Sequence, residues 1–389
     1  MSSDNHLSPD NHQKGYTQQR SRQQSPVDRN RIYRNGGLIV AAGLGLGWLA
    51  RKQWQRHRHP TDALAGQVVL ITGASRGLGL QLALEFAAIG CYLVICARDE
   101  RELERAQRIL AQQGADVLAV PCDVTKPEQV EALIATATHH YGKIDILVNN
   151  AGIIEVGPLQ TMQLADFANA MQVMYWGMLH TIWAVLPQMR ARGRGQIVNI
   201  TSIGGKVSIP HLLPYSGAKF AAVGLSEGLR AELAQAGIVV TTIIPGLMRT
   251  GSHLNATFQG RQGAEYTWFS LAASLPLLSM SAPHAARQIV EATARGDALR
   301  ILSLPAQLLA TVHDLFPQIT AEILAFIDRM VLPNAPSTKS GARRGQAVQA
   351  AFSPRRARLH KALTLLGQKA ALRLNQYAPS REVVSKQQD

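Results

Sequence analysis

Apolar and polar positions follow two different patterns through the middle of the chain. Short apolar runs occur at 67–72 (QVVLIT), 91–97 (CYLVICA) and 237–246 (GIVVTTIIPG), and stretches with helical periodicity lie between them, such as 80–90 (LQLALEFAAIG). Continuous apolar strands that alternate with helices are typical of a parallel sheet covered by helices on both faces. We therefore predict an α/β fold with one doubly wound parallel sheet over residues 62–304.

The first 61 residues lack this pattern. Residues 1–35 are polar and basic and predict a disordered tail, while 51–61 form a basic linker. Between them, 36–50 (GGLIVAAGLGLGWLA) carries no charge. A helix of that length rises about 22 Å, against roughly 30 Å for the hydrocarbon core of a bilayer. We predict a membrane anchor that spans or dips into the bilayer; a glycine-rich linker and a helix packed on the globular part are the alternatives.

Helical patterns return after the predicted domain. Residues 305–333 contain two apolar helical runs broken at Pro317, which could pack on the domain, on a partner subunit or on a membrane surface. Residues 334–389 predict a basic, partly disordered tail. One helix in this tail has an apolar stripe with basic residues around it, a pattern that suits an anionic lipid surface as well as a frayed helix: Leu359, Leu363, Leu366, Ala370 and Leu374.

The net charge of +14 is concentrated in the two tails. Residues 1–60 contain ten Lys and Arg against three Asp and Glu, and residues 336–389 contain eleven against two, which leaves nineteen against twenty-one between them. No aromatic and basic base-reading module accompanies the basic tails, so nucleic acid is not the expected partner. Membrane lipid is favoured instead. The three cysteines have no metal-ligand spacing, and no metal site is predicted.

A glycine-rich turn directly follows the first predicted strand and opens the first predicted helix. It reads Gly73-Ala-Ser-Arg-Gly77-Leu-Gly79. Glycines allow the backbone to approach a pyrophosphate closely, and the start of the helix supplies free N–H groups and the positive end of its dipole. The turn therefore predicts a phosphate-binding loop.

A second pattern carries candidate acid/base chemistry. Tyr215 and Lys219 are four residues apart, so on a helix they share one face, and Ser202 lies thirteen positions before the tyrosine. An adjacent ammonium group favours the phenolate and lowers the pKa of the phenol from its usual value near 10. A tyrosine tuned in this way could donate a proton to a carbonyl or accept one from an alcohol.

In this order along the chain, the sequences TGASRGLG, NNAG and Tyr215-Ser-Gly-Ala-Lys219 resemble the short-chain dehydrogenase/reductase family. The resemblance implies a single Rossmann-like catalytic domain with an N-terminal apolar segment and a C-terminal helical extension. It also implies that Ser202 binds the substrate oxygen, that Tyr215 is the acid/base, and that Lys219 tunes the tyrosine and holds the nicotinamide ribose. Asp123 would meet the adenine amino group, and the hydroxyl of Thr250 would contact the nicotinamide carboxamide.

The resemblance also gives a full set of expected cofactor contacts: Gly73, Ser75, Arg76, Gly77, Leu78, Gly79, Arg98, Asp123, Val124, Asn150, Ala151, Gly152, Tyr215, Lys219, Pro245, Gly246 and Thr250. Ala97 ends the second strand, where dinucleotide-binding folds usually carry an acid for the ribose diol. With no carboxylate there, and with Arg76 and Arg98 nearby to grip a 2′-phosphate, NADP(H) is predicted. The alternative is that Arg98 is only a solvated residue at a helix start.

One position departs from the family pattern. The family carries Val-Asn-x-x-Gly after NNAG, and the asparagine holds a water that links the lysine to solvent. Here the sequence reads Val173-Met174-Tyr175-Trp176-Gly177. Because a thioether cannot replace an amide in a hydrogen-bonded relay, proton resupply must be slower or use another group.

We expect an NADPH-dependent oxidoreductase that reduces a carbonyl or oxidises a secondary alcohol of a small molecule. The apolar lid region at 247–281 favours a hydrophobic substrate, although its residues could equally belong to the core. The alternative is a membrane-attached NADPH-binding scaffold or sensor with weak or absent catalysis. We expect membrane association with the catalytic domain facing the cytoplasm, and leave a homo-oligomer open.

Overall fold

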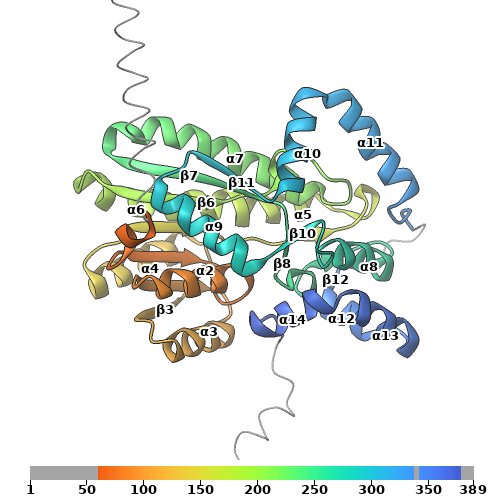
Figure 1. The fold of residues 1–389 in the computed structure, drawn as a ribbon, viewed down its shortest axis with the longest axis horizontal. Helices are drawn as coiled ribbons and strands as arrows, with labels where there is room; N and C mark the ends of the chain where they lie inside the picture. Colours follow the sequence, from red (N-terminus) through yellow and green to blue (C-terminus); the bar gives the residue numbers. More distant parts are fainter. Residues whose placement is uncertain (1–59, 337–340, 378–389) are drawn as a thin grey trace, which may run out of the picture. The chain divides into compact units, whose positions relative to one another are not determined.

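A seven-stranded parallel sheet forms the centre of this computed structural model, which describes residues 60–336 and 341–377 (Figure 1). The strand order is β11-β7-β6-β4-β1-β2-β3, and every pair is parallel. The predicted doubly wound sheet is confirmed. Its strands are β1 Val68–Thr72, β2 Tyr92–Ala97, β3 Val117–Pro121, β4 Ile146–Asn149, β6 Gly195–Ile200, β7 Ile238–Pro245 and β11 Leu299–Leu302.

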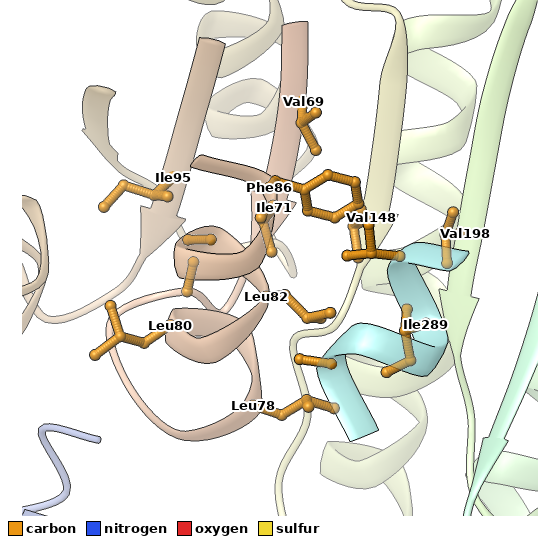
Figure 2. Packing of buried hydrophobic residues seen from close by; sticks show 14 of the residues in the cluster. Val69, Ile71, Leu78, Leu80, Leu82, Phe86, Ile95, Val148, Val198 and Ile289 are labelled. Carbon is orange, nitrogen blue, oxygen red and sulfur yellow. The ribbon is translucent and has the colours of Figure 1, made fainter. Parts of the chain in front are cut away.

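Three helices contribute to the hydrophobic core on each face of the sheet. One face carries α2 Gly77–Ala88, α3 Glu100–Gln112 and α9 Ala282–Arg295, and the other carries α4 Pro127–Tyr141, α6 Gly177–Ala191 and α7 Leu213–Leu233. On the first face, Phe86 of α2 and Ile289 of α9 belong to one cluster with Val148 and Val198 of the sheet (Figure 2). Because alternate strand residues enter the two cores, the central strands are apolar at nearly every position.

The order of the strands reverses beside β1, which pairs with β2 on one side and with β4 on the other. In doubly wound sheets, ligands bind at the carboxyl ends of the strands at such a reversal. The loop Gly73–Gly79, which follows β1, and the turn that follows β4 both lie at this end. The fold thus brings the predicted phosphate-binding loop and the NNAG sequence together.

Helix α7 carries the predicted Tyr215 and Lys219 pair. It begins at Leu213 and is followed by the short 3-10 helix η6 (Ala234–Ala236). Pro214 lies at the start of α7, where a missing N–H does no harm. Tyr215 and Lys219 therefore lie within its first two turns.

Smaller elements complete the described domain. Two short sheets pair β8 Leu247–Arg249 with β10 Ser279–Ser281, and β9 Thr257–Phe258 with both β5 Glu155–Val156 and β12 Arg343–Arg344. The other elements are η2 Pro60–Leu64, η3 Leu159–Thr161, α5 Leu164–Met171, the π-helix η4 Gln172–Trp176, η5 Ile203–Gly205, η7 Ser252–Leu254 and α8 Gln262–Ala272.

The C-terminal extension forms five helices in the described ranges. Helices α10 (Leu304–Leu315) and α11 (Pro317–Met330) meet at the predicted break and leave most of their apolar side chains exposed. The predicted amphipathic helix is divided at Thr364 into α13 (Pro354–Leu363) and α14 (Leu365–Arg373), which follow α12 (Gly345–Ala350). The predicted stripe is divided too: Leu359, Leu363 and Leu366 are exposed, whereas Leu374 is fully buried.

The predicted anchor at 36–50 lies outside the described residues, as do the rest of 1–59 and 378–389. Within 60–336 and 341–377, no helix combines the length and the apolar character needed to cross a bilayer.

Candidate active site

The loop after β1 is fixed by contacts with the turn after β4. The Asn150 side-chain amide donates to the carbonyl oxygens of Thr72 (2.9 Å) and Gly73 (3.0 Å). The Thr72 hydroxyl in turn accepts from the N–H groups of Asn150 (3.0 Å) and Ala151 (3.1 Å). Gly73 has φ +63°, and a Cβ there would lie 2.8 Å from the Ala151 Cα atom, so only glycine fits. The loop is therefore held in shape before any ligand binds.

Asn149 has a structural position in the core of the sheet. Its amide donates to the Asn199 Oδ1 atom (2.9 Å), and its Oδ1 atom accepts from the Thr181 hydroxyl (2.6 Å). Asn199 continues the network to Ser226, at 2.9 Å. These contacts join β4, β6, α6 and α7 across the buried interior. They hold the helix that carries Tyr215 against the strand that precedes Ser202.

The three predicted catalytic residues come together beside β6. The Tyr215 hydroxyl and Ser202 form a side-chain hydrogen bond. The Lys219 Nζ atom lies 5.9 Å from the centre of the Tyr215 ring and donates to the carbonyl oxygen of Ile200 (2.8 Å). Ser202 and Lys219 are both buried, and the Ser202 Oγ atom accepts from the Gly204 N–H (3.0 Å). Two hydroxyl groups can therefore reach one substrate atom.

Burial dominates the acid/base properties of this group. It raises the pKa of the Tyr215 phenol, and the hydrogen bond with Ser202 offsets part of that rise. Burial also lowers the pKa of Lys219 to about 8. The predicted lowering of the tyrosine pKa by an adjacent cation is not found: burial raises this pKa, and the effect that opposes it comes from Ser202. At neutral pH the tyrosine therefore keeps its proton, and the lysine is mostly charged.

Met174 lies beside this group, within the π-helix η4. It is buried, and together with Thr72, Asn149 and Lys219 it lines a cavity of about 10 Å³. That volume is close to the minimum for one water molecule. The structure thus puts Met174 next to Lys219, as expected if it occupies the relay position of the family. Its thioether offers the cavity no hydrogen-bond donor.

The side chains near the end of β2 include a pair that the sequence analysis missed. Arg76 forms an ion pair with Glu102 at 2.6 Å, and the Ser75 hydroxyl donates to the same carboxylate at 3.3 Å. Arg98 is exposed, and both it and Arg344 are near enough to contribute to the lowered pKa of Arg76, which is mainly due to burial. Arg98 and Arg344 thus add positive charge near Arg76, while Arg76 itself pairs with the Glu102 carboxylate. Arg344 comes from the C-terminal extension.

The remaining predicted cofactor residues lie along the same edge of the sheet. Asp123 follows β3, and its Oδ1 atom accepts from the Thr125 N–H (3.0 Å) and hydroxyl (2.9 Å). Val124 is buried against Gly177 at the start of α6. Pro245 ends β7 and is followed by Gly246 and the buried Thr250, whose carbonyl oxygen accepts from the Gln376 amide at 2.9 Å.

A buried histidine near Tyr215 was also missed. His211 lies 2.9 Å from Glu265 and 3.3 Å from Asp328 through its two ring nitrogens, and Glu265 accepts a further bond from the Trp268 indole at 2.7 Å. The contact with Asp328 ties α11 to the domain. His211 has φ +64°, a left-handed conformation that no local sequence signal indicates.

A doubly wound sheet with a glycine loop after β1 and a Ser, Tyr and Lys group at the carboxyl end of β6 defines a nucleotide-binding oxidoreductase of the Rossmann type. Residues 67–259 match the family model described as short chain dehydrogenase. The chain is 40% identical over 224 residues to the "Dehydrogenase/reductase SDR family protein 7-like" of Anopheles gambiae, which covers 56% of this chain and 69% of that protein.

Two solved structures resemble the described fold. A gluconate 5-dehydrogenase from Burkholderia cenocepacia, in complex with NADP and tartrate, has a TM-score of 0.57 at 30% identity and covers 64% of this chain and 99% of its own. A variant of the actinorhodin polyketide ketoreductase with NADPH has a TM-score of 0.55 at 28% identity and covers 61% of this chain and 95% of its own. The chain belongs to the short-chain dehydrogenase/reductase family.

Proposed function

We propose that this chain is an NADP(H)-dependent oxidoreductase that reduces the carbonyl group of a hydrophobic small molecule, or oxidises the corresponding secondary alcohol. The observation that carries the proposal is the contact of Ser202 with Tyr215, with Lys219 beside them, next to the glycine loop. When bound, the nicotinamide supplies or accepts the hydride. Ser202 and Tyr215 orient the substrate oxygen, and Tyr215 gives it a proton in the direction of reduction.

The protonation states support reduction at neutral pH. Burial raises the pKa of Tyr215, so its hydroxyl carries the proton that a reduced carbonyl oxygen needs. Lys219, whose pKa is lowered to about 8, is still mostly protonated and can supply positive charge near the developing phenolate. The Lys219 bond to the Ile200 carbonyl fixes its position.

Turnover is the test of this function. Purified full-length protein is mixed with NADPH and a panel of sterol, retinoid, fatty acyl and xenobiotic carbonyls, and the loss of NADPH absorbance is followed. We expect turnover with at least one class.

Ser202→Ala should lower kcat by roughly a hundredfold or more, as the loss of one oxyanion donor does. Ser208→Ala is the matched control, since Ser208 is exposed on the same loop. Unchanged kcat in Ser202→Ala would contradict the assignment.

The choice of NADP(H) rests on the charges at the end of β2. Ala97 supplies no carboxylate to repel a 2′-phosphate, and Arg76, Arg98 and Arg344 give the region positive potential. Glu102 opposes this preference through its ion pair with Arg76. The proposal therefore requires the phosphate to recruit Arg98 in addition to Arg76. The two solved structures named above contain NADP or NADPH, which agrees with it.

We predict that Arg98→Asp weakens NADPH binding more than NADH binding, because the new carboxylate repels the 2′-phosphate. Fluorescence titration with each nucleotide measures both dissociation constants. Arg108→Asp makes the same charge change at an exposed position of α3, the helix that follows Arg98. It should leave the ratio of the NADPH and NADH dissociation constants unchanged. An equal loss for both nucleotides in Arg98→Asp would rule out a role for Arg98 in phosphate recognition.

A hydrophobic substrate is supported by the surroundings of Tyr215. Tyr215 packs against two buried apolar clusters, one that includes Leu212 and Phe269 and one that includes Val173 and Met174. Part of the predicted lid is core: Tyr266 and Phe269 are buried. The apolar stretch at 247–281 therefore serves packing as well, and the contacts of Tyr215 itself are the stronger support.

A scaffold or sensor with little catalysis is the second candidate function, and Met174 is the observation that favours it. A buried thioether beside Lys219 would slow proton resupply. The carbonyl panel separates the two functions. NADPH binding without turnover on any class would favour the scaffold.

We also propose that residues 36–50 attach the chain to a membrane, with the catalytic domain facing the cytoplasm. The support is the uncharged stretch of sequence flanked by arginines. Deletion of residues 1–58 should move the protein from the membrane fraction to the soluble fraction. Unchanged sedimentation with membranes would transfer the role to the C-terminal helices.

A further inference from the structure

Residues Arg373–Gln376, here called the C-terminal strap, lie across the glycine loop. The Leu374 carbonyl oxygen accepts from the Gly77 N–H at 2.9 Å. The Asn375 amide donates to the Ser75 carbonyl at 2.8 Å, and the Gln376 amide donates to the Thr250 carbonyl at 2.9 Å. Gly77, Ser75 and Thr250 are three of the positions at which the cofactor is expected. The strap therefore follows the path expected for the dinucleotide.

The side chain of Asn375 is held by several specific contacts. Its amide also donates to the Glu102 carbonyl (3.1 Å), and its Oδ1 atom accepts from the Arg105 Nε–H (3.0 Å). Asn375 adopts φ +55°, a left-handed conformation that asparagine tolerates better than most residues. Both its donor and its acceptor groups are used, so the contact is selective for this side chain.

Gln376 is held in a similar way. The Asn255 amide donates to its backbone carbonyl (3.0 Å) and to its Oε1 atom (2.8 Å), and Gln346 donates to the same backbone carbonyl (2.9 Å). Both Asn375 and Gln376 therefore bind the domain through paired polar contacts, and the preceding Leu374 side chain is fully buried.

The strap and a pyrophosphate would need the same atoms of Gly77. This residue begins α2, its preceding residue supplies no side-chain cap, and its N–H is of the kind that binds a phosphate oxygen at a helix start. In the structure this N–H is bonded to Leu374. A Cβ at Gly77, which has φ +60°, would lie 2.8 Å from the Gln376 amide nitrogen, so the open space that glycine creates is filled by the strap.

We propose that the C-terminal strap is an autoinhibitory latch that occupies the pyrophosphate position, so that the dinucleotide binds only after the strap is released. The inference rests on the proposed cofactor of the site. A protein whose binding-competent state is a minor population binds its ligand more weakly by the size of that fraction. Weakening the latch should therefore strengthen cofactor binding, and the cofactor should expose the strap.

NADPH titration of the full-length protein tests the latch. Asn375→Ala combined with Gln376→Ala removes the side-chain hydrogen bonds of the strap but leaves its backbone contacts and α14 in place. We expect about tenfold tighter NADPH binding, since several net hydrogen bonds then no longer hold the closed state. Lys369→Ala is the control, because Lys369 is exposed on α14. As a second measurement, NADPH should accelerate tryptic cleavage after Arg373 in the wild-type protein.

The outcomes separate the latch from the cofactor assignment. Equal affinity in the wild type and the double variant, with no change in cleavage after Arg373, would overturn the latch and leave the cofactor in place. Weaker binding in the variant would mean that the strap helps to hold the dinucleotide, which also contradicts the latch. If neither protein bound NADPH or NADH, the cofactor assignment would fail and the latch with it.

Discussion

At the scale of single residues, the site combines expected groups with one unusual neighbour. Ser202, Tyr215 and Lys219 lie together as the motif spacing predicts, and Met174, which we propose stands in place of the relay asparagine of the family, lines a cavity with Lys219. The cavity there has room for about one water, and one of its walls is a thioether. We infer that proton return to Lys219 limits turnover.

Restoring an amide at this position should raise the rate. Met174→Asn gives a water in the cavity a donor and an acceptor, so we predict a kcat several-fold higher in carbonyl reduction. Met174→Leu is the matched control, because it changes the shape of the side chain but supplies no hydrogen bond. The rates are compared in ordinary and deuterated water. If the Asn and Leu variants turned over equally, the cavity would not be a proton path.

How much of the site is predictable depends on how local its signals are. The glycine loop, the NNAG turn and the Tyr215–Lys219 pair are short motifs, so the sequence was enough to locate them. The Arg76 ion pair with Glu102 joins residues 26 positions apart, and the His211 contact with Asp328 joins the domain to its extension. No spacing rule brings such side chains together, because their distance is set by tertiary packing.

At the scale of elements, the C-terminal helices are part of the folded domain. Val348 and Phe352 join the cluster of Tyr266 and Phe269 from α8, and the His360 ring forms a 2.7 Å hydrogen bond with Ser270. Helical periodicity predicted a helix in this region. The break at Thr364 and the docking onto α8 were not predictable, since the faces in contact come from segments about ninety residues apart.

Burial of histidines where the C-terminal helices pack on the domain makes the free energy of unfolding depend on pH. His253 is buried against Tyr266, and burial, with a smaller effect of His360, lowers its pKa to about 4. In the unfolded chain the His253 imidazole takes up a proton near pH 6.5, whereas in the folded chain it stays neutral until about pH 4. The folded state is therefore fully stable above pH 6.5 and loses this stability as the pH falls towards 4. The loss amounts to about 3 kcal/mol at most. We predict a decrease in Tm over this range.

A non-titrating variant isolates the contribution of His253. His253→Gln should show a smaller decrease in Tm between pH 6.5 and 4 than the wild type. His139→Gln, at an exposed position of α4, should match the wild-type slope. Parallel slopes in all three proteins would mean that other groups account for the acid sensitivity.

At the scale of the whole molecule, the parallel sheet explains why distant motifs meet. The residues that follow β1, β4, β6 and β7 gather at one edge because the carboxyl ends of parallel strands face the same way. Which segments form strands and which form helices was predictable from the apolar runs and the helical periodicity between them. The position of the C-terminal strap on that edge was not, since its contacts span about three hundred residues.

The central claim is that the Tyr215 hydroxyl transfers the proton in an NADPH-dependent reduction. The most direct measurement compares turnover and NADPH affinity in the wild type, in Tyr215→Phe and in the control Tyr92→Phe, since Tyr92 on β2 is 43% exposed. We predict that Tyr215→Phe loses turnover by a factor of at least about a hundred while its NADPH dissociation constant changes little. Wild-type turnover in Tyr215→Phe would contradict the account.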